Sequence, residues 1–154
     1  MKKYLVLVFV SFIGVILQTS LFLEIFGPKV NPNIVFALGF AFLFSNKQKY
    51  ALRTALVSGV LLDLLSFNVV GTTSLFMIFS FYASKFIQEK FFKGIGVLVF
   101  LSIIFFTIYK MLYGLGGATR VPLDAKILIG STVSTAIALI GSGLIGMYLK
   151  DLKD

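Results

Sequence analysis

Asp63 is the residue of this chain whose type and position could support chemistry. The 154 residues include six acidic ones, and of these Asp63 lies well inside an apolar run, Ala51 to Phe67. A carboxylate within a membrane-spanning helix costs roughly 2.5–3.5 kcal/mol on insertion scales, and it usually faces protein or water. Two roles fit such a group: a carboxylate that couples a proton or a ligand, or a paired carboxylate that fixes the register of neighbouring helices.

The small residues before Asp63 indicate which face of the helix it occupies. They recur at four-residue spacing, at Ala51, Ala55 and Gly59. Residues at that spacing share one face of a helix, and small side chains let two helices approach closely. We therefore predict that these residues form a packing face and that Asp63 points into a helix bundle.

Polar residues of two other apolar runs lie at a similar height. Counting the helical rise from the start of each run places Gln18 level with Asp63 and Lys110 a little higher. Burying a carboxylate without a partner is far more costly than pairing it. We therefore predict an intramembrane polar cluster of Asp63, Gln18 and Lys110, with the Thr72–Thr73 turn as a further candidate partner of Asp63.

The last apolar run carries a second row of small residues. Each step in the row is four residues long, and its members are Gly130, Ser134, Ala138, Ser142 and Gly146. Small residues in a row allow close helix packing. The row is either a packing face within this bundle or a docking face for a single helix of another protein.

Residue types that are missing exclude most enzyme classes. The chain has no His and no Cys, so imidazole ligation, thiolate metal sites and Ser-His or Cys-His catalysis are excluded. An intramembrane protease built on two aspartates would need a second aspartate at depth, which the sequence lacks. We therefore predict no catalytic residues, no cofactor and no metal site, and hence that the protein is not an enzyme.

The composition indicates lipid as the solvent. Hydrophobic residues make up 58% of the chain and charged residues 13%, against about 45–50% and about 25% in soluble domains. Apolar runs of the length that can cross a bilayer predict an all-α, polytopic transmembrane bundle in a single domain, 1–154. Its six expected spans are residues 4–26, 33–45, 51–67, 72–87, 94–113 and 127–149. Asn31 and Pro32 resemble a helix cap and first-turn proline before the short second span.

The basic residues indicate the orientation. Six spans with a cytoplasmic N-terminus place ten of the 14 basic residues on the inside, and cytoplasmic loops are enriched in Lys and Arg. Both termini are therefore expected in the cytoplasm. The net charge of +8 comes from basic residues dispersed between apolar runs, which is typical of membrane-flanking charge and not of a nucleic-acid-binding protein.

The chain resembles the MreD family of multi-pass rod shape-determining proteins of the bacterial cell (inner) membrane. The resemblance covers nearly the full length, and Gln18 also fits it. It is carried by Asn31-Pro32-Asn33 before the second span, by the stretch Gly59 to Leu65 around Asp63, and by Gly71. The turn at residues 66–70 contains fewer glycines and prolines than that family shows.

The resemblance implies a non-enzymatic role in cell elongation. Its direct partner would be an MreC-like single-span protein. Indirect partners would be the filament protein MreB, the SEDS glycosyltransferase and a penicillin-binding transpeptidase, with membrane lipid around the protein and no nucleic acid bound. The family resemblance also implies the six-helix fold of substrate-binding subunits of energy-coupling-factor transporters.

Such a transporter subunit, binding a vitamin-type small molecule, is the alternative function. These subunits often carry an Ala-x-x-x-Ala surface motif in the first span, where it docks the coupling subunit. The first span of this chain lacks that motif, and Ala37 and Ala41 form one in the second span instead.

Overall fold

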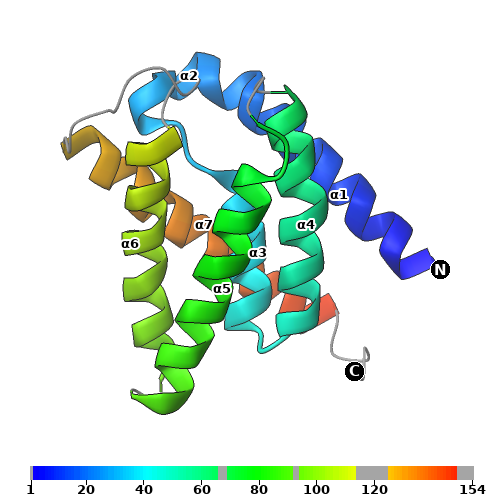
Figure 1. Cartoon of the computed structure of the whole chain (residues 1–154), viewed down its shortest axis with the longest axis vertical. Coiled ribbons are helices and arrows are strands. Elements are labelled where there is room, and N and C mark those ends of the chain that lie inside the picture. Colours follow the sequence, from blue (N-terminus) through cyan, green and yellow to red (C-terminus); the bar gives the residue numbers. More distant parts are fainter. Residues whose placement is uncertain (1, 66–68, 92–93, 114–124, 149–154) are drawn as a thin grey trace.

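The computed structural model of the chain describes residues 2–65, 69–91, 94–113 and 125–148. All regular structure in these residues is helical, so the expected all-α fold class is confirmed (Figure 1). The seven helices are α1 (Lys2–Thr19), α2 (Leu21–Val30), α3 (Ile34–Phe44), α4 (Gln48–Leu65), α5 (Thr72–Lys90), α6 (Ile95–Tyr113) and α7 (Ala125–Tyr148).

The exterior of the bundle is strongly apolar. Phe9, Phe79 and Ile140, each on a different helix, are all more than 60% exposed. A soluble monomer rarely exposes apolar surface on this scale. Three segments are long and apolar enough to cross a membrane, namely Val8–Phe26, Ile95–Leu112 and Ala125–Ile145. These features are those of a membrane protein.

The first apolar run, expected as one span, is divided into two helices. α1 ends at Thr19, whose hydroxyl donates to the Val15 carbonyl at 2.9 Å, and α2 begins after Ser20. A Thr or Ser hydroxyl that competes for the carbonyl of the preceding turn often bends a helix. α1 slopes away from the other helices, and α2 lies across one end of the bundle (Figure 1).

α3 is the central helix of the bundle. It has 11 residues, a length of about 16 Å, which is shorter than a bilayer core. α3 can be this short because most of its side chains are buried in the bundle, where other helices and not lipid surround them. The expected cap at Asn31–Pro32 is wrong: Asn33 caps the helix, and its side chain accepts a hydrogen bond from the Phe36 N–H at 3.1 Å.

Aromatic rings fill the core around α3. Phe36 lies at the centre, and its ring centroid is 4.9 Å from that of Phe106 and 5.4 Å from that of Phe81. Phe40 packs on the same two rings, at 5.5 Å and 5.0 Å. Such pairs each contribute about 0.5–1.5 kcal/mol beyond the area they bury. The core therefore joins α3, α5 and α6 through ring contacts.

Hydrogen bonds between α3 and α7 show that the two helices run parallel. Just before α3, the Asn33 N–H donates to Ser134 Oγ at 2.9 Å. At the other end of α3, Ser45 Oγ donates to the Ser142 carbonyl at 3.2 Å. The start of α3 therefore lies beside the first half of α7, and its end lies beside the second half.

α6 runs antiparallel to α7. Thr107, near the end of α6, donates to Ser131 near the start of α7 at 3.1 Å, and Ser102 pairs with Thr135 at 3.1 Å. These are bonds between side-chain hydroxyls buried in an apolar surrounding. They favour this register of the two helices, because sliding either helix by one turn would break both contacts between the helices.

Candidate functional site

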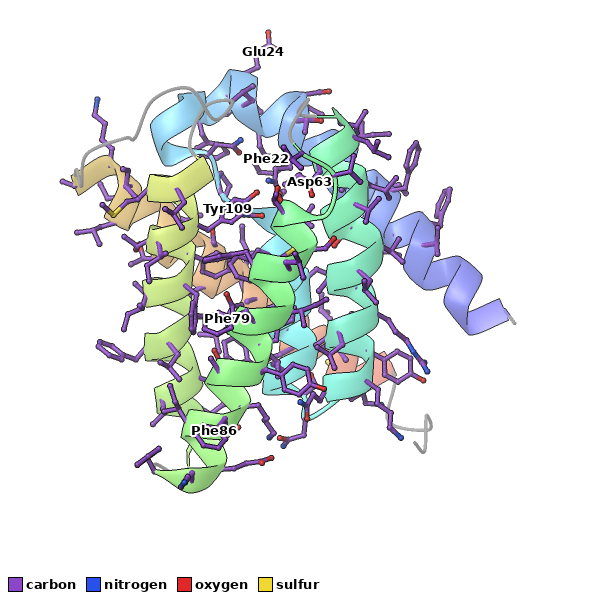
Figure 2. All side chains as sticks on the ribbon, viewed as in Figure 1. Phe22, Glu24, Asp63, Phe79, Phe86 and Tyr109 are labelled. Atoms are coloured by element: carbon purple, nitrogen blue, oxygen red, sulfur yellow. The ribbon has the colours of Figure 1, made fainter. Side chains whose placement is uncertain are left out.

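Asp63 lies at the end of α4, fully buried, against the start of α5 (Figure 2). Its Oδ2 atom accepts a hydrogen bond from the Gly71 N–H at 2.8 Å. The Thr73 N–H donates to both carboxylate oxygens, at 3.1 Å and 3.3 Å. Of the three partners expected for Asp63, the structure therefore has the Thr72–Thr73 turn.

The start of α5 requires an acceptor from elsewhere in the chain. The first N–H groups of any helix have no partner within the helix, and a side chain at the cap usually accepts from one of them. The cap position of α5 is Gly71, with a φ of 99°, and it has no side chain to do so. Asp63 supplies the missing oxygens, and its negative charge also suits the positive end of the α5 dipole.

Gly59 brings α4 and α5 close enough for this cap. A Cβ atom added at Gly59 would lie 2.7 Å from both the N and the Cα of Ser74. The Ser74 hydroxyl also donates to the Leu56 carbonyl of α4 at 3.3 Å. We call Gly59, Asp63, Gly71, Thr73 and Ser74 the α4–α5 junction. In it, backbone contact and carboxylate capping hold two antiparallel helices together.

Tyr109 extends the junction to α6. Its hydroxyl lies 3.4 Å from the Thr73 hydroxyl, and its ring packs on Phe36 and Phe76 (Figure 2). Lys110 is the next residue of α6 and is 9% exposed. Two consecutive polar side chains near the end of α6 are therefore buried, and Tyr109 contacts the start of α5.

Gln18 serves a different helix start. Its Oε1 atom accepts from the Val35 N–H at 3.0 Å, and its carbonyl accepts from Asn31 Nδ2 at 3.2 Å. Asp63 is bonded to α5, whereas Gln18 is bonded to α3 and the segment before it. Two members of the expected cluster, Asp63 and Gln18, therefore accept hydrogen bonds from two different helix starts.

The row of small residues in α7 packs on α3 over its first half. Gly130, Ser134 and Ala138 are buried, and Ser142 is partly buried. The surroundings of Gly146 lie outside the description. Beside the row, a Cβ added at Gly141 would lie 3.2 Å from the Ala41 side chain. On α4, the predicted packing residues Ala51, Ala55 and Gly59 are likewise buried.

Sequence reasoning missed the bond between Asn33 and Ser134, which are 101 residues apart. It also missed Tyr109 as a partner of the α5 start. Gly71 was the sequence feature that could have indicated the cap of α5 by Asp63. A glycine directly before a helix has no side chain to cap it, so another residue must supply the acceptor. Within the described residues, no three acidic side chains gather to hold a metal ion.

The fold and the site together define an all-helical membrane protein whose buried polar groups cap helix starts. Its candidate site is a helix junction in which both carboxylate oxygens of Asp63 accept backbone hydrogen bonds. Comparison of the chain with protein-family models, with curated proteins and with solved structures found no match.

Proposed function

We propose that the protein is a non-enzymatic membrane scaffold of the bacterial cell-elongation machinery, similar to MreD, in the inner membrane. It would bind an MreC-like single-span protein and thereby help to position peptidoglycan synthesis. The observation that carries the proposal is the α4–α5 junction. Gly59, Asp63 and Gly71, which carry the family resemblance, are all used to join two helices. Residues that fix the position of one helix against another support the function of a scaffold.

The packing of the core supports a scaffold over a vitamin-binding subunit. Phe36, Phe40, Phe81 and Phe106 are fully buried and pack on one another in the middle of the bundle. The possible docking motif of the alternative, Ala37 and Ala41, is buried as well. A buried motif offers no surface to a coupling subunit.

The directions of the helices support six spans within this proposal. α3 and α7 are parallel, α6 is antiparallel to α7, and α4 is antiparallel to α5. Lys85, in the last turns of α5, donates to Asn46 in the turn after α3 at 3.1 Å, so α5 runs parallel to α3. This alternation is what successive crossings of a bilayer require. Both termini then lie in the cytoplasm.

Reporter fusions test this topology. With six spans, a fusion after Lys153 reports the cytoplasmic side and a fusion at Thr119 the opposite side, because ten of the 14 basic residues then lie inside. The readout is the activity of a paired cytoplasmic and periplasmic reporter at each position. The same reporter active at both positions would contradict the span count.

Affinity purification in mild detergent tests the partner. We expect the tagged protein to recover an MreC-like single-span protein from bacterial membranes, and a tagged, unrelated polytopic protein not to do so. Recovery of ATPase subunits in its place would overturn the scaffold proposal and favour the transporter subunit.

Cysteine cross-linking can then locate the partner-binding face. The chain has no native cysteine, so each introduced one is a single reporter. Phe9 on α1, Phe79 on α5 and Ile140 on α7 are exposed on three different helices. We expect a cysteine at one of these positions to cross-link to a cysteine in the partner span. Equal cross-linking from all three would indicate random collision in the membrane.

A further inference from the structure

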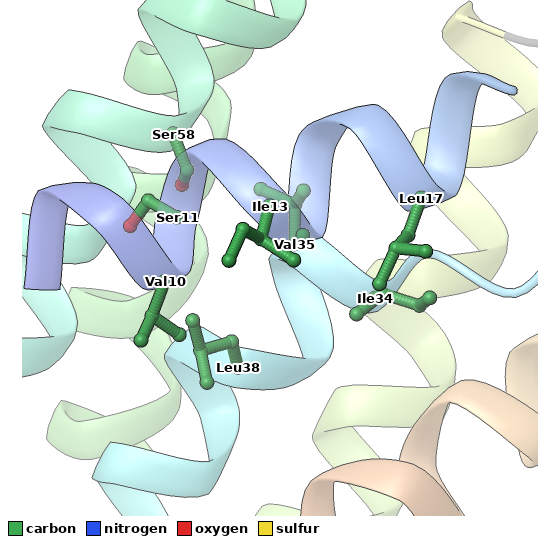
Figure 3. A pocket seen from close by; sticks show the side chains of 9 residues that line it. Val10, Ser11, Ile13, Leu17, Ile34, Val35, Leu38 and Ser58 are labelled. Carbon is green, nitrogen blue, oxygen red and sulfur yellow. The ribbon is translucent and has the colours of Figure 1, made fainter.

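A cavity of about 190 Å³ lies between α1, α3 and α4, away from the α4–α5 junction (Figure 3). Val10, Ile13 and Leu17 of α1 line one side, Ile34 and Leu38 of α3 line another, and Ser58 of α4 closes the end. The Ser58 hydroxyl is already bonded to the Thr54 carbonyl. The surface offered by the cavity is therefore almost entirely hydrocarbon.

Gly14 marks where the space is unfilled. It is buried and lines the cavity, yet a Cβ atom added to it would have no atom within 4 Å. Protein interiors are normally close-packed, and a gap deprives its lining of dispersion contacts. An occupant of matching shape would restore those contacts.

The cavity opens toward the lipid chains. It is partly open, and Val10 and Ile13, which line it, are each 41% exposed. Both residues lie in the candidate span Val8–Phe26. The opening therefore faces the hydrocarbon core of the bilayer and not its headgroups.

We propose that this cavity binds one acyl chain of a membrane phospholipid. An apolar cavity of roughly 150 Å³ stays dry and accepts a small hydrocarbon, so this one suits a segment of a lipid tail. A helix of a partner protein, with a diameter of about 10–12 Å, is too wide to enter it. The proposal does not depend on the function proposed above.

Photolabelling tests the proposal. The full chain is placed in vesicles of phosphatidylcholine that carries a diazirine at mid-chain, and labelled peptides are mapped by mass spectrometry. We expect residues 34–38 to be labelled several-fold more than the exposed position Phe79. Gly14→Leu should lower this labelling several-fold, because the leucine side chain would fill the space that the lipid tail occupies.

Gly143→Leu is the matched control. Gly143 is also helical and also has no atom within 4 Å of an added Cβ, but it lies exposed on α7. Its replacement should leave labelling at residues 34–38 unchanged. Leu38→Phe narrows the same cavity from α3 and should act like Gly14→Leu, which keeps the test valid if one variant fails to fold.

Ser11 distinguishes a hydrocarbon chain from a polar occupant. Its hydroxyl is buried beside the cavity and has no hydrogen-bond partner among the described residues. If the occupant is a hydrocarbon chain, Ser11→Ala should leave labelling at residues 34–38 unchanged. A loss of labelling in this variant would indicate an occupant that is hydrogen-bonded to the Ser11 hydroxyl. Labelling at residues 34–38 no greater than at Phe79, or unchanged in both folded narrowing variants, would overturn the proposal.

Discussion

Replacing Asp63 with leucine is expected to lower the free energy of unfolding by about 3 kcal/mol, since one buried and one partly buried N–H donor lose their acceptor. The donors are those of Gly71 and Thr73, and Asp63 itself is fully buried. A donor left unpaired away from water carries its full desolvation cost. The measurement is thermal unfolding in mild detergent, followed by recovery of the proposed MreC-like partner, which we expect to fall in parallel.

Asp63→Asn separates the structural role from a proton-coupling role. The amide oxygen can still accept a backbone hydrogen bond, so we expect a loss of about 1 kcal/mol, mainly from the missing charge at the helix start. Partner recovery should largely persist. Leu64 is the matched neighbour, because it is exposed to the outside of the bundle, and Leu64→Ala should have little effect. A folded Asp63→Asn protein that supports no function would instead indicate proton coupling.

The face on which Asp63 lies was predictable, whereas its partner set was predictable only in part. Four-residue spacing defines a face of one helix without reference to any other helix. The helical rise likewise predicts how far along its own run Gln18 lies, without reference to any other helix. The direction in which Gln18 points depends on how α1 rotates against α3. That rotation is decided by the packing of the whole bundle, and it directs Gln18 to the Val35 N–H.

The bounds of the helices also divide into those that the local sequence determines and those that depend on neighbouring helices. The last five apolar runs predicted the extents of α3 to α7 closely, because an apolar run ends where polar residues begin. The division of the first run at Ser20 was not predictable, since a hydroxyl bends a helix only in some surroundings. The cap of α3 was placed two residues early. Asn31 and Asn33 both suit a cap by type, and the Ser134 hydroxyl that binds the Asn33 N–H comes from α7.

Gly59→Ala is expected to be strongly destabilising, although it adds a single methyl group. The new Cβ would lie 2.7 Å from the Ser74 backbone N and Cα, which cannot rotate away as a side chain can. Overpacking of a core costs about 1–3 kcal/mol. Separating α4 from α5 also lengthens the bonds of Asp63, so we expect a total near 3 kcal/mol in detergent unfolding.

The matched control for this change is Gly143→Ala. Gly143 lies within α7, and an added Cβ there has no atom within 4 Å. Alanine should therefore stabilise the helix by about 0.5–1 kcal/mol. If Gly59→Ala unfolds no earlier than Gly143→Ala, the close approach of α4 to Ser74 is contradicted.

A double mutant tests whether Gly59 and Asp63 act as one junction. Each single change, Gly59→Ala or Asp63→Leu, should already break the contact between α4 and the start of α5. Residues that share partners show coupling energies of about 0.5–3 kcal/mol, so the double variant should lose less stability than the sum of the two single losses. Independent sites would give losses that add. Additive losses would therefore mean that the close approach at Gly59 does not position Asp63 on the N–H groups of Gly71 and Thr73.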